Sequence, residues 1–153
     1  MNLFDTNPNQ PRTELKLDKA LDFILAGKST FTLQSITGKH FTYKVEAPKK
    51  KNPAKEVHFV KLMTGSDNEG SFTHFATIFD KAAYKHGAKS RITADAQGVR
   101  AFRWFLTNLM NGTVNDQVKL FHEGCCARCG RKLTTPESIE TGIGPECAKM
   151  MSK

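Results

Sequence analysis

All four cysteines of this 153-residue chain lie among its last thirty residues, at positions 125, 126, 129 and 147. Cys126 and Cys129 form a Cys-x2-Cys pair followed by Gly130, and Cys147 comes two residues after Pro145 in the run GIGPEC. Such a pair supplies two thiolates from one tight turn, and structural zinc takes four ligands, mostly thiolates and imidazoles. The spacing therefore predicts one structural Zn²⁺ in a small zinc-knuckle module that resembles a treble clef.

The fourth zinc ligand has two candidates. His122 lies four residues before Cys126, and Cys125 is directly adjacent to it. We favour His122, because the side chains of neighbouring residues in a turn diverge, and Cys125 is the second choice. We expect a structural metal, since a catalytic zinc keeps an open position beside an acid or base and nothing arranges Glu123 or Glu146 as a general base.

The composition of the chain indicates its cellular compartment and the class of its binding partners. No apolar run approaches the ~18–20 residues of a membrane span, and the start, MNLFDTNPNQPR, lacks the pattern of a secretory signal. We therefore expect an intracellular protein, in which thiols stay reduced and cysteines serve metal ligation rather than disulfides. The net charge of +8 favours polyanionic partners such as nucleic acid.

Hydrophobic spacing predicts the elements that precede the cysteines. Apolar residues from Leu17 to Leu25 share one helical face and predict a helix over about Thr13 to Ala26. The alternating runs STFTLQS and HFTYKVE, joined by a turn with Gly38, predict a β-hairpin. VHFVKLM and FTHFATIF predict two more strands, whereas DKAAYKHGAKSR is ambiguous between a short helix and a loop. We expect a four-stranded antiparallel sheet.

A second helix is predicted after the sheet. Val99, Phe102 and Leu106 share a face, Gly112 can end the helix, and Thr93 or Asp95 can cap its start. The predicted class is α+β, with an N-terminal helix, an antiparallel sheet, a packing helix and the C-terminal module. The predicted units are a flexible arm at 1–12, an α+β domain at 13–113 and a zinc-binding module at 114–153.

The run HEGCCARCGRKLTTPESIETGIGPECA resembles the C-terminal module of a family of small, uncharacterised proteins of bacteriophages and bacteria. Its pattern is His-x3-Cys-x2-Cys-Gly-Arg-x-Leu-Thr, then Pro-x-Ser-Ile, then Gly-Ile-Gly-Pro-x-Cys. TGKHFTYKV, VHFVKLMTGSDNEGSF and AFRWF also look like upstream segments of phage members. The resemblance implies a phage origin and zinc, but no activity, because the family has no known function. Together with the expected intracellular location, a phage origin places the protein in the host cytoplasm. It implies that the metal ligands are His122, Cys126, Cys129 and Cys147.

Basic residues near aromatic ones are the candidates for nucleic-acid contact, because bases stack on rings while cations follow phosphates. Those on or after the hairpin are Lys39, Lys44, Lys49, Lys50 and Lys51, and those around the knuckle are Arg128, Arg131 and Lys132. The alternating aromatic face of the hairpin is expected to be core. Arg100 and Trp104 are four residues apart and could stack, but we expect Trp104 to be buried.

Enzymatic motifs are missing from the sequence, which has no nucleophile elbow, no phosphate-binding P-loop and no His-Glu-x-x-His. The leading interpretation is a non-enzymatic, zinc-containing phage protein that binds nucleic acid, plausibly single-stranded DNA, in phage DNA metabolism. The alternative is a protein-interaction factor that binds and inhibits or redirects a host protein. Affinity that falls steeply with salt would indicate phosphate contacts.

Overall fold

The computed structural model describes residues 13–15, 17–48, 56–64, 72–80, 83–113, 117–122, 124–133, 139 and 141–151. The predicted arm at 1–12 and the lysines at 49–51 lie outside these residues. Among the described residues, no helix combines the length and the apolar character that crossing a membrane requires.

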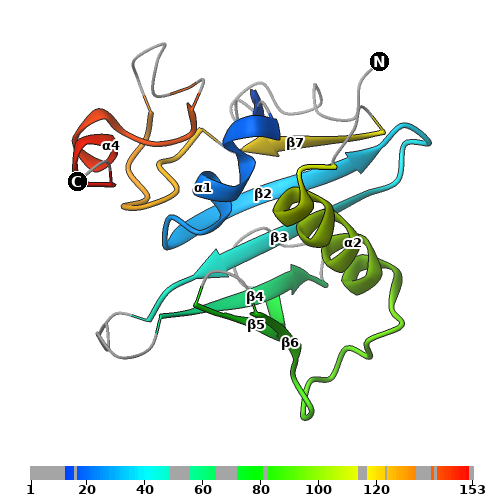
Figure 1. Ribbon diagram of the computed structural model, residues 1–153. Helices are drawn as coiled ribbons and strands as arrows, with labels where there is room; N and C mark the ends of the chain where they lie inside the picture. The colour runs from blue at the N-terminus through cyan, green and yellow to red at the C-terminus, as the bar shows by residue number, and fades with distance from the viewer. Residues whose placement is uncertain are drawn as a thin grey trace.

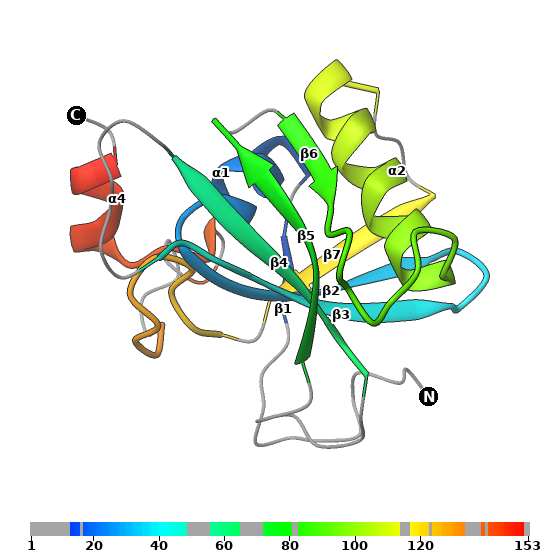
Figure 2. The same ribbon diagram turned by 90° about the horizontal axis from the view of Figure 1, so that it is seen from below.

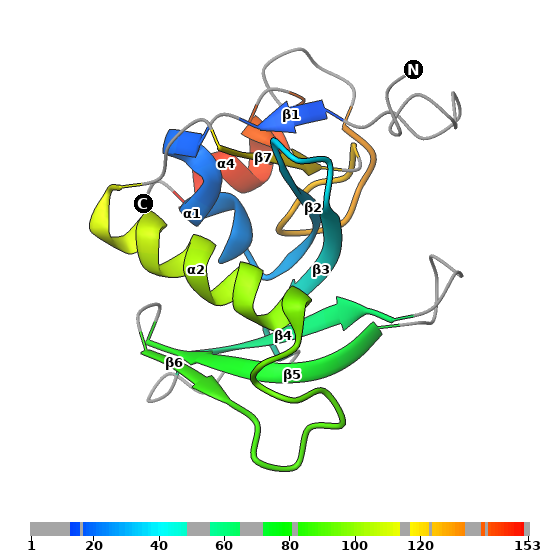
Figure 3. The same cartoon turned by 90° about the vertical axis from the view of Figure 1, so that its right-hand side faces the viewer.

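Within the described residues, the chain forms one antiparallel sheet of seven strands, with two helices on one face and a third at one end (Figure 1). The elements are β1 (Thr13–Leu15), the 3-10 turn η2 (Leu17–Lys19), α1 (Ala20–Ile24), β2 (Lys28–Ser35), β3 (His40–Glu46), β4 (Val57–Met63), β5 (Phe72–Phe79), β6 (Ala83–His86), α2 (Gln97–Asn111), β7 (Val118–His122) and α4 (Pro145–Met151). The strand order is β1-β7-β2-β3-β4-β5-β6. The sheet curves around α1 and α2, so that β7 and β6 lie on opposite sides of the helices (Figure 3).

The predicted α+β class with an antiparallel sheet is confirmed, but the prediction of four strands is wrong. The four predicted strands correspond to β2 to β5, and β6 comes from the segment whose pattern is ambiguous. The predicted helix from Thr13 to Ala26 is also wrong, because its first residues form β1 and only Ala20–Ile24 is α-helical. β1 pairs with β7, more than a hundred residues away, and this pairing overrides the local helical spacing.

The strand β7 joins the main sheet to the cysteine segment. It lies between β1 and β2, with His122 opposite both Thr13 and Phe31. The sequence pattern assigns β7 to the separate module at 114–153, but the pairing of β7 with β1 and β2 places this strand inside the sheet. The cysteine-containing turn therefore starts directly from one of the inner strands.

The aromatic face of the β2–β3 hairpin packs against α2. Phe31, Tyr43 and Phe102 are completely buried, and the rings of Tyr43 and Phe102 lie 5.1 Å apart. The Tyr43 hydroxyl donates a 2.5 Å hydrogen bond to the carbonyl of Gly98 in the first turn of α2. This aromatic face is part of the core, as predicted, and it fixes the position of α2 against the hairpin.

The two ends of α2 differ in how well the sequence predicts them. Gly112 ends the helix in the left-handed conformation, with φ of 68°, as expected. The helix begins after Ala96, and no side chain caps it, so the predicted capping role of Thr93 or Asp95 is wrong.

Candidate functional site

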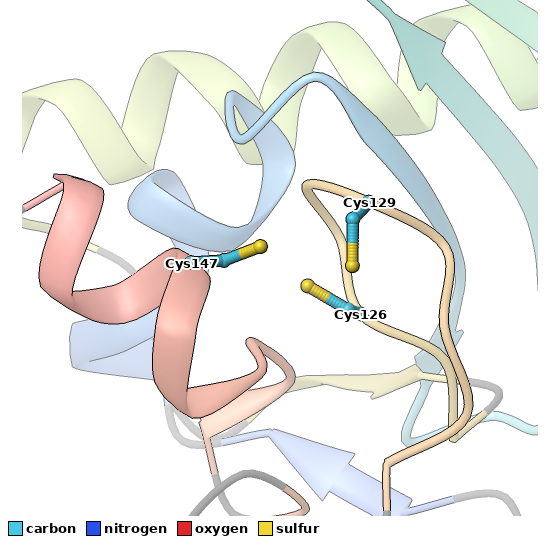
Figure 4. Close-up of side chains that lie close together, drawn as sticks. All are labelled: Cys126, Cys129 and Cys147. Atoms are coloured by element: carbon cyan, nitrogen blue, oxygen red, sulfur yellow. The ribbon is translucent and has the colours of Figure 1, made fainter.

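Three of the four predicted metal ligands converge in the structure. The Sγ atoms of Cys126, Cys129 and Cys147 all lie within 4.8 Å of one another, and Figure 4 shows them pointing toward a common centre. Cys126 and Cys129 come from the turn after β7, and Cys147 comes from the start of α4. Because three sulfur atoms from two separate segments can act together, this cysteine cluster can hold a metal ion.

The turn that carries the first two cysteines is closed by backbone hydrogen bonds. The amide of Cys126 donates to the carbonyl of Arg131 at 2.8 Å, and the amide of Gly130 donates back to the carbonyl of Cys126 at 2.9 Å. Gly130 has φ of +82°, a conformation that residues with a Cβ rarely adopt. A glycine at this position therefore lets the chain reverse tightly enough for both thiols to face the same side.

Backbone amides also point at the sulfur of Cys126. The amide of Gly144 donates to it at 3.2 Å, and the amide of Arg128 donates to it at 3.4 Å. Burial of the thiol opposes ionisation, but hydrogen bonds from Gly144, Cys129 and Arg128 outweigh burial and lower the pKa of Cys126 to about 7. The site therefore favours the thiolate form that a metal requires.

Cys147 has the opposite electrostatic environment. Burial raises the pKa of this thiol, and hydrogen bonds with the other two cysteine thiols raise it further. The guanidinium of Arg128 opposes this effect, because its Nη1 atom lies 3.5 Å from the sulfur. Because the thiols of Cys126 and Cys129 raise the pKa of Cys147, a cation between the three sulfur atoms would favour the thiolate form of Cys147.

His122, the predicted fourth ligand, is not part of this cluster. It is fully buried, its Nδ1 atom accepts a hydrogen bond from the amide of Gly124 at 3.0 Å, and its Nε2 atom lies 2.6 Å from the carbonyl of Ile139. Only the neutral ring with hydrogen on Nε2 satisfies both contacts. In this structure the imidazole thus connects β7 to the segment before α4 instead of facing the sulfur atoms.

Cys125, the second candidate for the fourth ligand, also lies outside the three-sulfur group. It is exposed and pairs with Lys132 in an isolated antiparallel β-bridge. The adjacent Cys126 is buried, so the two neighbouring side chains differ in environment, as expected for consecutive residues of a turn.

The three basic residues predicted around the knuckle do gather beside the cysteines. Arg128, Arg131 and Lys132 line a cavity of about 370 Å³ together with Cys126, Cys129 and Cys147. Glu146 is the one acidic residue among the described residues of its lining, so the cavity has an excess of positive charge. Arg131 and Lys132 are exposed, whereas Arg128 is half-buried, and its guanidinium also contacts the sulfur of Met150 at 3.4 Å.

The two described lysines of the predicted hairpin set, Lys39 and Lys44, do not share one surface. Lys44 forms an ion pair with Glu46 at 3.4 Å and lies over the ring of Phe72. It alternates with Tyr43 along β3, so it lies on the sheet face opposite to α2. Lys39 is exposed at the turn between β2 and β3 and lines a groove beside α2.

This groove, of about 840 Å³, contains residues that the sequence analysis does not combine into a site. Besides Lys39 it is lined by Arg100, Arg103 and Trp104 of α2. The expectation that Trp104 is buried is wrong, because 44% of its surface is exposed. The only signal in the sequence is that Arg100 and Trp104 lie one helical turn apart. Their proximity to Lys39 depends on how α2 packs on the hairpin.

The groove and the cysteine cluster lie at opposite ends of β2. The amide of Lys28, the first residue of β2, donates to the carbonyl of Ala127 in the cysteine turn at 2.6 Å. Ser35, the last residue of β2, lines the groove. Figures 1 and 2 both show α4 at one end of this strand and the β2–β3 turn at the other.

In the comparison with known proteins, a family matches the cysteine segment alone. Residues 121–152 match the model of a family of unknown function (DUF6011). The match covers the end of β7, the cysteine turn and α4, and it supports the expected resemblance to uncharacterised proteins. No curated protein and no solved structure matches the chain.

Proposed function

We propose that this protein is a non-enzymatic, zinc-containing phage protein that binds nucleic acid, single-stranded DNA above all, in phage DNA metabolism. The observation that carries this proposal is the cavity in which three basic side chains surround the cysteine cluster, with a single acid among its described lining residues. Positive side chains at such a density attract phosphates, and the net charge of +8 acts in the same direction.

Zinc is the metal in this proposal, because three convergent thiolates are soft donors that suit Zn²⁺ better than Mg²⁺ or Ca²⁺. Cys126, Cys129 and Cys147 would supply three of the four ligands that a structural zinc site takes. When bound, Zn²⁺ supplies a cross-link between the cysteine turn and α4, which is a structural role rather than a catalytic one. The basic residues would thereby be fixed on a rigid turn.

The test is a titration of labelled DNA with the metal-loaded protein over a range of salt concentrations. We expect log K to fall linearly with log salt, and the combined variant Arg128→Ala, Arg131→Ala and Lys132→Ala to bind more weakly with a shallower slope. A matched control removes three other exposed cations, Lys85, Lys89 and Arg91, which lie on β6 and after it.

Metal content is measured in both variants, so that loss of the fold is distinguished from loss of charge. Equal weakening in the two variants would mean that only net charge matters and would remove the knuckle from the proposal. Wild-type protein that fails to bind at low salt would refute nucleic-acid binding altogether.

The second candidate function is binding to a host protein, which the protein would inhibit or redirect. It is favoured by Met150, an apolar side chain that lines the knuckle cavity and is 59% exposed, so that an apolar partner surface can contact it. Apolar contacts predict affinity with weak salt dependence. The same salt series, carried out with a captured host partner, separates the two functions.

A further inference from the structure

We infer that the groove between α2 and the β2–β3 turn is a binding site for single-stranded nucleic acid. Trp104 would stack on a base, and Lys39, Arg100 and Arg103 would contact phosphates. This inference rests on the proposed function and adds to it a second contact site for the strand, which is distant from the cysteine cluster.

The first argument is the division of α2 into two faces. Its buried face consists of Gly98, Val99, Phe102, Phe105 and Leu106. Apart from Arg103, the residues of α2 that line the groove lie three or four apart on the other side of the helix, namely Gln97, Arg100, Ala101, Trp104, Thr107 and Asn108. These six residues include no acid and no large aliphatic side chain, so this second face is built neither as core nor as a balanced ionic surface.

The second argument is the charge of the groove. Lys39, Arg100 and Arg103 are all exposed, and no Asp or Glu is among the described residues that line it. Outside the lining, the carboxylate of Asp95 interacts with Arg100, and its pKa is lowered mainly by its hydrogen bond to Thr93. The groove therefore has an excess of positive charge, which a polyanion complements.

The third argument is the exposed indole. Trp104 is 44% exposed, although aromatic residues of α2 such as Phe102 and Phe105 are completely buried. Its position beside cations on the wall of a groove is the arrangement that proteins use to hold unpaired bases, because every base has a π-face. Bases within a duplex are already stacked on each other, so the groove favours single strands over duplexes.

The groove also has an apolar floor. Its floor comes from Leu33 and Val118, which are almost completely buried in the sheet, and from the half-buried Phe41. A base that stacks on Trp104 would lie over this apolar floor, while its phosphates face the exposed cations. A purely acidic peptide would satisfy the cations but would leave the apolar floor and the indole without a partner.

The groove is separate from the knuckle. β2 has 8 residues, so at ~3.3 Å per residue its two ends lie about 23 Å apart. Variants at one site should therefore leave the other site intact, and the two contributions to binding can be measured independently.

The chain itself provides the probe for the test, because Trp104 is its only tryptophan. Full-length, metal-loaded protein is titrated with labelled oligothymidylate of about 15 nucleotides, since single-strand sites on small domains span ~4–16 nucleotides. Indole fluorescence and probe anisotropy are recorded in the same titration. We expect the fluorescence to change with the same midpoint as the anisotropy, and a duplex of equal length to bind more weakly.

Two variants of the indole and one pair of charge variants complete the test. Trp104→Ala should weaken binding about tenfold or more, and Trp104→Phe should restore most of it. Arg100→Gln with Arg103→Gln should lower the salt slope by about 1.4, because each phosphate that a cation neutralises on a single strand adds ~0.7 to the slope. The matched controls are Phe79→Ala, an exposed aromatic on β5, and Lys85→Gln with Lys89→Gln.

The outcomes separate this inference from the proposed function. Binding that leaves the indole fluorescence unchanged and is insensitive to Trp104→Ala would overturn the groove and leave the proposed function standing. An absence of binding to any nucleic acid at low salt would overturn both. Equal affinity for the duplex would also reject the groove as a site for unpaired bases.

Discussion

The backbone amide of Gly144 donates a hydrogen bond to the sulfur of Cys126 at 3.2 Å, although the two residues are 18 positions apart. This contact joins the cysteine turn to the segment that leads into α4. A second link runs from the amide of Ala127 to the carbonyl of Gly142 at 2.9 Å. The polypeptide itself thus brings the two halves of the candidate metal centre together, and the sulfur that receives the amides is the one whose pKa is lowered.

Replacement of the converging cysteines should abolish metal binding. Cys126→Ser or Cys147→Ser removes one of three sulfur atoms that lie within 4.8 Å of each other, so we expect the bound metal to fall from one equivalent to a small fraction. The measurement is metal content after dialysis, together with the thiolate charge-transfer absorption of the cobalt-substituted protein. That absorption reports sulfur ligands directly.

Cys125→Ser is the matched control, since this cysteine is adjacent to Cys126 but exposed and outside the cluster. We expect it to keep one equivalent of metal and an unchanged cobalt spectrum. Loss of thiolate absorption in this variant would show that Cys125 is a ligand and that the turn rearranges around the metal.

Removal of the metal with a chelator should loosen the C-terminal segment and leave the sheet intact. The cysteine turn has few buried apolar side chains of its own, whereas the sheet is stabilised by Phe31, Tyr43 and Phe102. We expect the amides of residues 124–133 to exchange with solvent faster in the metal-free protein, while those of β3 and β4 keep their protection. Hydrogen exchange by mass spectrometry measures this, and uniform loss of protection would show that the metal supports the whole fold.

The strong local patterns are sufficient to predict much of the fold. The alternation around Gly38 identifies β2 and β3, and the spacing of Val99, Phe102 and Leu106 identifies α2. β1 and β7 cannot be found in this way, because strands of three and five residues have too few positions to show a period. Their existence depends on pairing between the two ends of the chain, which no local window contains.

The candidate site, like the fold, is only partly predictable from the sequence. The Cys-x2-Cys spacing and the run GIGPEC identify the three cysteines that converge. His122 is expected from the sequence to face the metal, but its place at the end of an inner strand turns the ring toward the carbonyl of Ile139. The groove cannot be predicted from the sequence, because Lys39 and Trp104 are 65 positions apart. Only the packing of α2 on the hairpin brings these two residues into one cavity.

The stability of the protein should decrease in mild acid because of His122. Burial lowers the pKa of this imidazole below its ordinary value of 6.5, and protonation would place a second N–H against the amide of Gly124. The unfolded chain therefore binds a proton more readily than the folded one. The stabilisation is complete above pH 6.5 and decreases as the pH falls below it, by up to about 1.4 kcal/mol per pH unit.

This pH dependence is measured by denaturant unfolding between about pH 7 and pH 5 in the wild type and in His122→Gln, whose side chain does not titrate. Metal release in acid is common to both proteins, so the difference between their slopes isolates the imidazole. His40→Gln serves as the control, because His40 is exposed. Parallel slopes for the wild type and His122→Gln would contradict the prediction.

A pair of glycines provides a controlled test of the packing behind the cysteine cluster. Gly142 and Gly112 have φ of +73° and +68°, so alanine costs about 1–2 kcal/mol of backbone strain at either position. A Cβ at Gly112 meets nothing within 4 Å, whereas at Gly142 it would overlap the buried ring of Phe23. Overpacking adds about 1–3 kcal/mol, so Gly142→Ala should lower the free energy of unfolding clearly more than Gly112→Ala. Denaturant midpoints measure both, and equal effects would show that the segment before α4 can move away from Phe23 at no cost.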